Sequence, residues 1–159
     1  MRRRSGWAFR LNHWQYLNAE RTNGMELPVD VEFVEDANLF IWRPHGVLSE
    51  ALVNNIIGFV REKEETLGWS FNRFTDLSAL DAVNLNFDYV FHIALYRRLS
   101  YAGGKVKSAF YVSSSDAAHY AKLHALVTGG SPLQVSVFTE LEAAAKWLDV
   151  PLETLLARR

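Results

Sequence analysis

Apolar and polar positions along this chain alternate with a period of two in some segments and with a period of about 3.6 in others. Residues 29–34 alternate as a half-buried strand does, and a polar turn at 35–38 separates them from an apolar run at 39–42. This pattern predicts a β-hairpin. Further strands are expected at 69–75, 105–113 and 133–138, so the predicted sheet has about five strands.

The first predicted helix, at 50–67, places four apolar side chains on one stripe: Val53, Ile56, Ile57 and Val60. Ser49 is expected to cap its start and Gly68 to end it. The second helix is expected to begin near Asn84 or Asn86. Its apolar stripe is expected to consist of Phe87, Val90, Phe91, Ala94 and Leu95.

Two more helices are predicted in the second half of the chain. Residues 113–116 offer several capping side chains for the third, which is expected to end at Gly129. Thr139 and Glu142 have the spacing of a capping box, which predicts the start of the fourth. Its inner stripe is expected to be Leu141, Ala144, Ala145 and Leu148. Strands that alternate with single helices imply right-handed crossovers, so we expect an α/β fold with a mixed, largely parallel sheet and four helices.

One α/β domain is expected over residues 29–150, because no internal repeat or low-complexity linker interrupts this segment. Residues 1–28 carry five arginines and two glutamates, a net charge of +3, and are interpreted as a basic, aromatic leader. An alternative is an arm that docks on the domain or on an anionic membrane. Residues 151–159 are expected to form a short turn or tail.

The composition is that of an ordinary soluble domain, with 49% hydrophobic and 22% charged residues and a formal net charge of −1. This balance gives no electrostatic footprint for nucleic acid. The sequence has no cysteine, which excludes disulfides and thiolate chemistry and fits a reducing compartment. No apolar run approaches the roughly 20 residues of a membrane span. We therefore expect a cytoplasmic protein without an integral membrane segment.

Five histidines invite a search for a metal site. His119 and His124 are five residues apart, so on a helix their side chains point about 140° away from each other. The H-E-x-x-H motif, glycine-rich phosphate loops and the G-x-S-x-G elbow are absent from the sequence. We expect no metal and no cofactor. Asp76, Asp81 and His92 are the set that favours acid–base chemistry, and a hydrolase built on them is one alternative function.

Seven aromatic side chains are expected to build the core: Phe40, Trp42, Phe71, Phe74, Phe87, Phe91 and Phe110. A filled core is the simpler interpretation for an α/β domain. The other interpretation is an apolar cavity between sheet and helices that carries a small, lipid-like ligand.

Four short segments carry a family resemblance: I-W-R-P-H-G-V-L-S (41–49), F-T-D-L-S (74–78), S-A-F-Y-V (108–112) and V-F-T-E-L-E-A-A-A-K-W-L (137–148). With the order of the predicted elements, they resemble the SpoIIAA-like group, the STAS-related fold of bacterial anti-sigma-factor antagonists. The match is to an uncharacterised bacterial branch of that group and covers about residues 29–150. It implies a regulatory, protein-binding domain.

In the antagonists, a strand end of the form D-L-S is followed by D-S-S-G, whose serine at the helix start is phosphorylated by the partner kinase. Asp76, Leu77 and Ser78 match the first part. The second part is replaced by N-L-N-F at 84–87, with Asn86 in the place of the serine. We therefore expect a domain that lacks the phosphorylation switch.

The resemblance also implies that partners dock at the turn before the second helix and along that helix. Exposed aromatic groups beside polar groups are reasonable interface residues. The leading hypothesis is a non-enzymatic protein-binding surface made of Asp76, Ser78, Asp81, Asn84, Asn86, Asp88, Tyr89, His92 and Tyr96. The expected partner is another protein, and a homodimer is also considered.

Overall fold

Five strands form a mixed sheet at the centre of the computed structural model, which describes residues 30–156. The strand order is β1-β2-β4-β6-β7, with the bounds Val31–Val34, Leu39–Trp42, Asn72–Asp76, Val106–Tyr111 and Leu133–Phe138. β1 is antiparallel to β2, and every other pair of neighbours in this sheet is parallel. The predicted α/β fold, with a largely parallel sheet opened by a hairpin, is confirmed.

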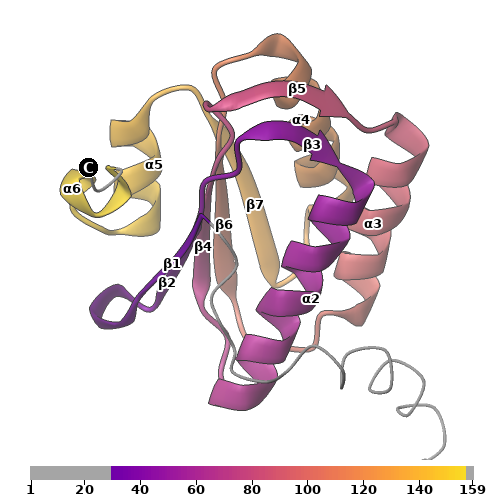
Figure 1. The fold of residues 1–159 in the computed structure, drawn as a ribbon. Coiled ribbons are helices and arrows are strands. Elements are labelled where there is room, and N and C mark those ends of the chain that lie inside the picture. The colour runs from indigo at the N-terminus through magenta and orange to yellow at the C-terminus, as the bar shows by residue number, and fades with distance from the viewer. Residues whose placement is uncertain (1–29, 157–159) are drawn as a thin grey trace, which may run out of the picture.

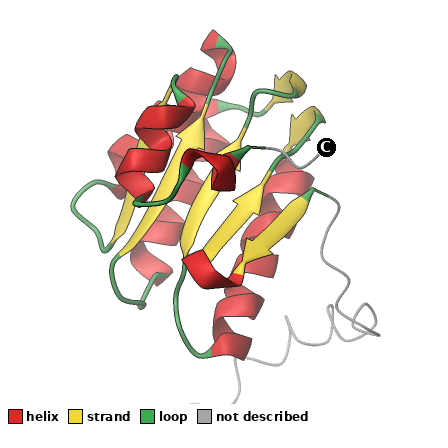
Figure 2. Ribbon diagram, turned by 90° about the vertical axis from the view of Figure 1, so that its left-hand side faces the viewer, coloured by secondary structure: helices red, strands yellow, loops and turns green. Residues whose placement is uncertain are grey.

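Helices cover both faces of this sheet (Figure 1). One face carries three helices, α2 (Glu50–Leu67), α3 (Phe87–Ser100) and α4 (Ser115–Thr128). The other face carries α5 (Leu141–Leu148) and α6 (Leu152–Leu155), which lie in front of the strands in Figure 2. The described part of the chain therefore has five helices, one more than expected.

The additional helix, α6, lies in the segment expected as a terminal turn or tail, and it is packed on the sheet. Its Leu155 is only 1% exposed. Nη2 of Arg43, which follows β2, donates a hydrogen bond of 3.0 Å to the carbonyl oxygen of Leu155. This contact joins positions more than a hundred residues apart and ties the end of α6 to the end of β2.

A second, two-stranded parallel sheet was not expected from the sequence. It consists of β3 (Gly46–Ser49) and β5 (Leu80–Asn84), and β5 crosses the region expected to be a polar turn. Both strands are short and β5 is mostly exposed, so neither shows the alternation that marks a half-buried strand. The strand expected at 69–75 also starts later, at Asn72.

The sheet separates two apolar clusters, because side chains along a strand alternate between its faces. On β2, Phe40 and Trp42 face α2 and α4, whereas Leu39 and Ile41 face α5 and α6. The buried residues of α5 are Ala144, Ala145 and Leu148, three of the four residues of its predicted stripe. The α5 side of the sheet is a filled core.

Side-chain caps fix the starts of the three helices on the other face. Ser49 accepts a hydrogen bond from the backbone N–H of Leu52, and Asn86 accepts one of 2.7 Å from that of Tyr89. Ser114 caps α4 in the same way. These caps confirm the predicted starts. The predicted capping box at Thr139 is wrong, because α5 starts at Leu141 without a side-chain cap.

The inner stripe of α3 also differs from the prediction. Val90 and Ala94 are buried, but Phe87 and Phe91 are 54% and 45% exposed and do not belong to the core. The helix turns Tyr89, Ile93, Tyr96 and Arg97 toward α2 and the sheet instead. The prediction assumes that the inward face of α3 is its most apolar face. That assumption fails here because the inward face is partly polar.

Candidate functional site

A cavity of about 650 Å³ lies between the central strands and the helices α2, α3 and α4. This volume falls within the range of small-molecule sites, which is about 300–1,000 Å³. Most of its wall is apolar and includes Trp42, Ile56, Val83, Val90 and Ile93. Where α5 packs closely on the opposite face, α2 and α3 leave a space over the sheet.

The mouth of the cavity lies between α2 and α3, and polar side chains span it at two places. Near the helix starts, Tyr89 Oη donates a hydrogen bond of 2.8 Å to Asn54 Oδ1. Two turns further along, Arg61 Nη1 donates one of 3.2 Å to Tyr96 Oη. Hydrogen bonds of this kind in contact with water contribute little net stability, about 1 kcal/mol each, so these bridges hold the two helices together only weakly.

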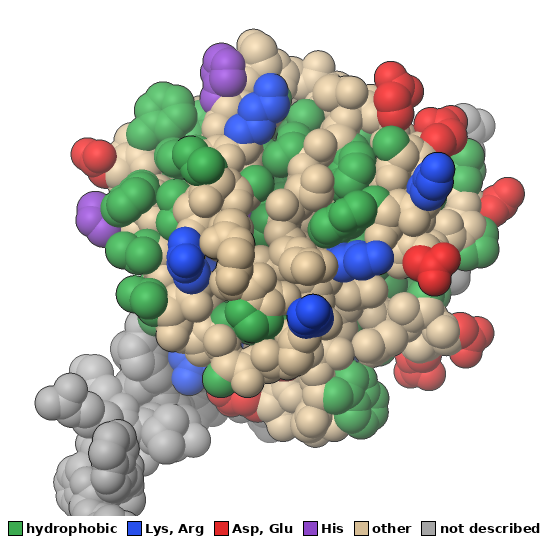
Figure 3. Space-filling model, turned by 180° about the vertical axis from the view of Figure 1, so that it is seen from behind, with side chains coloured by type: hydrophobic (Ala, Val, Ile, Leu, Met, Phe, Trp, Pro, Cys, Tyr) green, Lys and Arg blue, Asp and Glu red, His purple; other side chains and the backbone are tan. Residues whose placement is uncertain are grey.

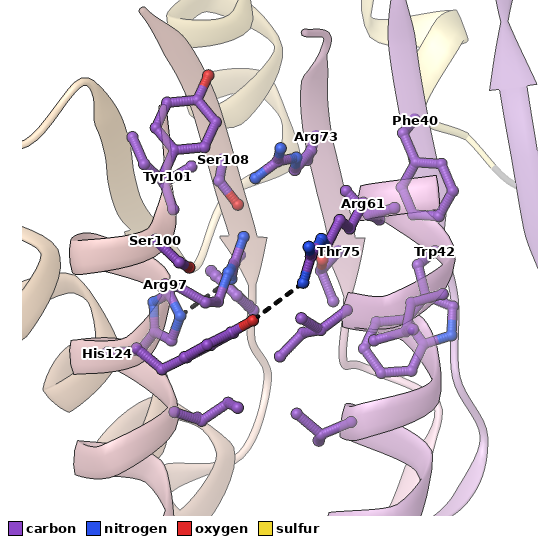
Figure 4. A pocket seen from close by; sticks show the side chains of 18 of the residues that line it. Phe40, Trp42, Arg61, Arg73, Thr75, Arg97, Ser100, Tyr101, Ser108 and His124 are labelled. Carbon is purple, nitrogen blue, oxygen red and sulfur yellow. Dashed lines mark hydrogen bonds between the residues drawn. The ribbon is translucent and has the colours of Figure 1, made fainter. Parts of the chain in front are cut away.

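Polar side chains gather at one end of the cavity, and the sheet supplies three of them. Arg73 and Thr75 come from β4 and Ser108 comes from β6, and all three are buried. Arg97 of α3 and His124 of α4 complete the group (Figure 4). Buried polar groups on the two central strands are unusual, because both faces of such strands are covered and are normally apolar.

Arg73 is held by an ion pair with Glu64 of α2. Both side chains are largely buried, with 7% and 17% of their surface exposed. The Arg73 guanidinium also lies 5.8 Å from the ring centroids of Phe71 and Tyr101. Its Nε is buried without a hydrogen-bond partner among residues 30–156. The ion pair neutralises Arg73 but leaves part of its donor capacity unused.

Arg97 lies against His124, with Nη1 of the arginine 3.0 Å from Nε2 of the histidine. A guanidinium only donates hydrogen bonds, so Nε2 is the acceptor and the histidine proton is on Nδ1. Burial lowers the pKa of His124 well below its usual range, and the positive charges of Arg97 and Arg73 lower it further. His124 is therefore a neutral base at physiological pH.

Arg97 is deep in the protein, yet part of its surface stays open because that surface faces the cavity. Burial, aided by the charge of Arg73, lowers the pKa of Arg97 to about 9, against the opposing influence of Glu64 and Tyr101. The guanidinium is thus charged at neutral pH. Since Glu64 balances one of the two arginines, the described residues leave one positive charge at this end of the cavity uncompensated.

The hydrogen bonds of the residues predicted to bind a partner are mostly local. Asp76 Oδ1 accepts hydrogen bonds from the backbone and hydroxyl of Ser78, and Asn86 is the cap of α3. His92 Nδ1 lies 2.6 Å from the carbonyl oxygen of Asp88, one turn back on the same helix. The remaining four divide into an exposed pair on β5 and a pair at the cavity mouth: Asp81 and Asn84, and Tyr89 and Tyr96.

The set proposed for a hydrolase is not joined by hydrogen bonds within the described residues. Asp76 is hydrogen-bonded to Ser78, Asp81 is exposed on β5, and His92 is hydrogen-bonded to Asp88 of its own helix. Nor do three or more His, Asp or Glu side chains of residues 30–156 gather as a metal-binding group. His119 is exposed and His124 is buried, so these two point apart as predicted.

The polar end of the cavity was missed from the sequence, although β4 contains a signal for it. Its alternation places Phe74 on one face and Arg73 and Thr75 on the other. In a central strand covered on both faces, an arginine must be buried and therefore paired. Nothing local in α3 marks Arg97, which resembles its exposed neighbour Arg98 in sequence but not in position.

No helix between residues 30 and 156 combines the length and apolar character needed to cross a membrane. Comparison with protein-family models, curated proteins and solved structures finds no match to this chain.

Proposed function

We propose that the protein binds and carries a small, mainly apolar molecule in the cavity between the sheet, α2 and α3. The observation that supports this proposal is the cavity itself, about 650 Å³ of space where an α/β domain normally has a packed core. The opposite face of the same sheet is filled by Phe74, Ala109 and the buried residues of α5. The space is therefore a local property of one face.

A ligand of this kind also accounts for the way α2 and α3 are joined. The two helices are bridged by the hydrogen bonds of Tyr89 and Tyr96 to side chains of α2, and side chains at the mouth are partly exposed. Such bridges break and re-form readily in water. A carrier needs a mouth of this type, because its cargo must enter and leave without unfolding of the domain.

The test is binding of Nile red, an uncharged apolar dye, to the full chain after removal of co-purified lipid. We expect saturable fluorescence enhancement that is lost in Ile93→Trp, because the larger side chain fills the cavity. Leu126→Trp is the matched control, since Leu126 is 78% exposed on α4 and does not line the cavity. Equal dye binding by both variants, or none by the wild type, contradicts the proposal.

A second candidate function is docking of another protein on the outer side of α3. Phe87, Phe91 and Leu99 are 54%, 45% and 76% exposed, and Figure 3 shows hydrophobic side chains gathered on the side of the molecule where α3 lies. Exposed aromatic side chains of this kind favour an interface. Loss of a protein-sized complex in native mass spectrometry on Phe91→Asp supports this candidate, and an unchanged complex excludes Phe91 from the interface.

A further inference from the structure

The polar end of the cavity has more positive charge than its own residues balance. Arg73 and Arg97 contribute two charges and Glu64 contributes one of opposite sign. His124 is kept neutral by burial and by the two arginines. A buried charge without a counter-ion is costly, and proteins normally pair it. Within residues 30–156, one positive charge at this end of the cavity is therefore left without a counter-ion.

Arg97 is the residue that carries this excess. Among residues 30–156 its only hydrogen-bond partner is Nε2 of His124, which is a neutral acceptor, and no carboxylate lies within ion-pair distance. Its remaining N–H groups face the cavity. In Figure 4, Arg61, Arg73 and Arg97 extend from three different elements toward the same space between α2 and α3.

Hydroxyl groups add donors at the same end. Thr75, Ser100 and Ser108 line the cavity there (Figure 4), and none of the three hydroxyls has a hydrogen-bond partner within the described residues. Hydroxyl groups that can donate beside a guanidinium are suited to the oxygens of an anion. Most of the rest of the wall is apolar, so this end offers the densest set of donors for one end of a ligand.

We propose, on the basis of the ligand-carrying function above, that the cargo is an amphipathic carboxylic acid whose carboxylate pairs with Arg97 and whose apolar chain fills the remainder of the cavity. The size of the unbalanced charge favours a carboxylate over other head groups. A carboxylate carries one negative charge and balances the excess, whereas a phosphate monoester carries about −1.5 to −2 at neutral pH and overcompensates it. An uncharged alcohol of the same length leaves Arg97 without a counter-ion.

The test compares three probes of equal chain length on the full, delipidated chain: dodecanoate, dodecanol and dodecyl phosphate. In calorimetric titration of the wild type, we expect dodecanoate to bind at least about tenfold more tightly than dodecanol. A charge-assisted hydrogen bond accounts for a difference of this size. Arg97→Gln, which keeps much of the size and a donor, is expected to abolish this preference while dodecanol still binds. Arg97→Lys keeps the charge and is expected to retain it.

Arg98→Gln is the matched control, because Arg98 is the exposed neighbour, donates a hydrogen bond to the carbonyl oxygen of Val127 and does not line the cavity. This variant is expected to keep the full preference for dodecanoate. Equal affinity of dodecanoate and dodecanol for the wild type, or an unchanged preference in Arg97→Gln, overturns the inference and leaves the carrier function standing. Tighter binding of dodecyl phosphate overturns the carboxylate class. Binding of none of the three probes contradicts the carrier function itself.

Discussion

Arg97 donates a hydrogen bond of 3.0 Å to Nε2 of His124, so the one hydrogen-bonding partner of this buried cation within residues 30–156 is a neutral base. The contact orients both side chains but does not balance the charge. A protonated His124 repels Arg97, which explains why burial and the two arginines together hold the imidazole in its neutral form. The pair therefore presents a fixed positive charge to the cavity.

Removal of the charge of Arg97 is expected to stabilise the ligand-free protein. Replacement of uncompensated buried charge by an apolar group of similar volume is often stabilising, and we expect Arg97→Met to raise the free energy of unfolding by about 1–2 kcal/mol. Chemical denaturation of delipidated protein measures this change. Arg98→Met, on the exposed neighbour, is expected to change stability by less than about 0.5 kcal/mol. A large loss of stability in Arg97→Met contradicts the unbalanced charge.

The neutral state of His124 predicts a loss of stability in mild acid. Its pKa in the folded protein lies below the unfolded value, so below about pH 6.5 the unfolded chain binds a proton that the folded protein does not. Stability therefore falls as pH decreases, with a contribution of up to about 1.4 kcal/mol per pH unit. Urea denaturation between about pH 7.5 and pH 5 measures this loss of stability, because histidine side chains ordinarily titrate within that interval.

Two variants separate this contribution from that of the other histidines. His124→Gln retains an acceptor for Arg97 but does not titrate, so its stability is expected to fall less with acid than that of the wild type. His119→Gln changes an exposed histidine on the same helix and is expected to follow the wild type. Identical pH dependence in wild type and His124→Gln is the result that contradicts a buried, neutral His124.

The bridges at the cavity mouth are expected to control how fast a ligand exchanges. Combined Tyr89→Phe and Tyr96→Phe substitutions remove the contacts of these hydroxyls with Glu50, Asn54 and Arg61 of α2 and keep the rings. Stopped-flow release of Nile red is expected to accelerate several-fold, with only a small change in affinity. Tyr111→Phe on β6, outside the cavity lining, is the control. Unchanged release in the double variant excludes these bridges as the gate.

Asn86 is expected to matter as a helix cap. Its Oδ1 accepts the backbone N–H of Tyr89 at 2.7 Å, and loss of such a cap costs about 1 kcal/mol. Asn86→Ala is therefore expected to destabilise the protein by that amount, whereas Asn86→Ser keeps a capping oxygen and stays close to the wild type. Thermal denaturation of the two variants distinguishes them. Equal stability of both contradicts the capping role.

Elements with strong local signals were predictable from the sequence. Ser49 and Gly68 mark the two ends of α2, and the bounds of β2 and β7 follow from short apolar runs between polar segments. The helix ends depend on nearby residues only, because a capping oxygen or a glycine in the left-handed conformation stabilises the helical turn beside it. β3 and β5 were missed because each is stabilised by pairing with a segment distant in sequence.

The cavity residues were less predictable, since their role depends on how helices sit on the sheet. Polarity alone would place Phe87 inside and Arg97 on the surface. In the structure Phe87 is on the surface and Arg97 is inside. The alternation in β4 places Arg73 inside, but only the assembled fold shows that Glu64 balances it and that Arg97 has no such partner. Charge balance at a buried site is a property of three-dimensional packing.

Native mass spectrometry of the full chain, purified gently from its own cells, tests the central claim most directly. The account predicts an added mass of a few hundred daltons, about that of one molecule in a cavity of this size, which solvent extraction releases as an acid with an apolar chain. Protein without any bound small molecule, including after incubation with dodecanoate, contradicts it.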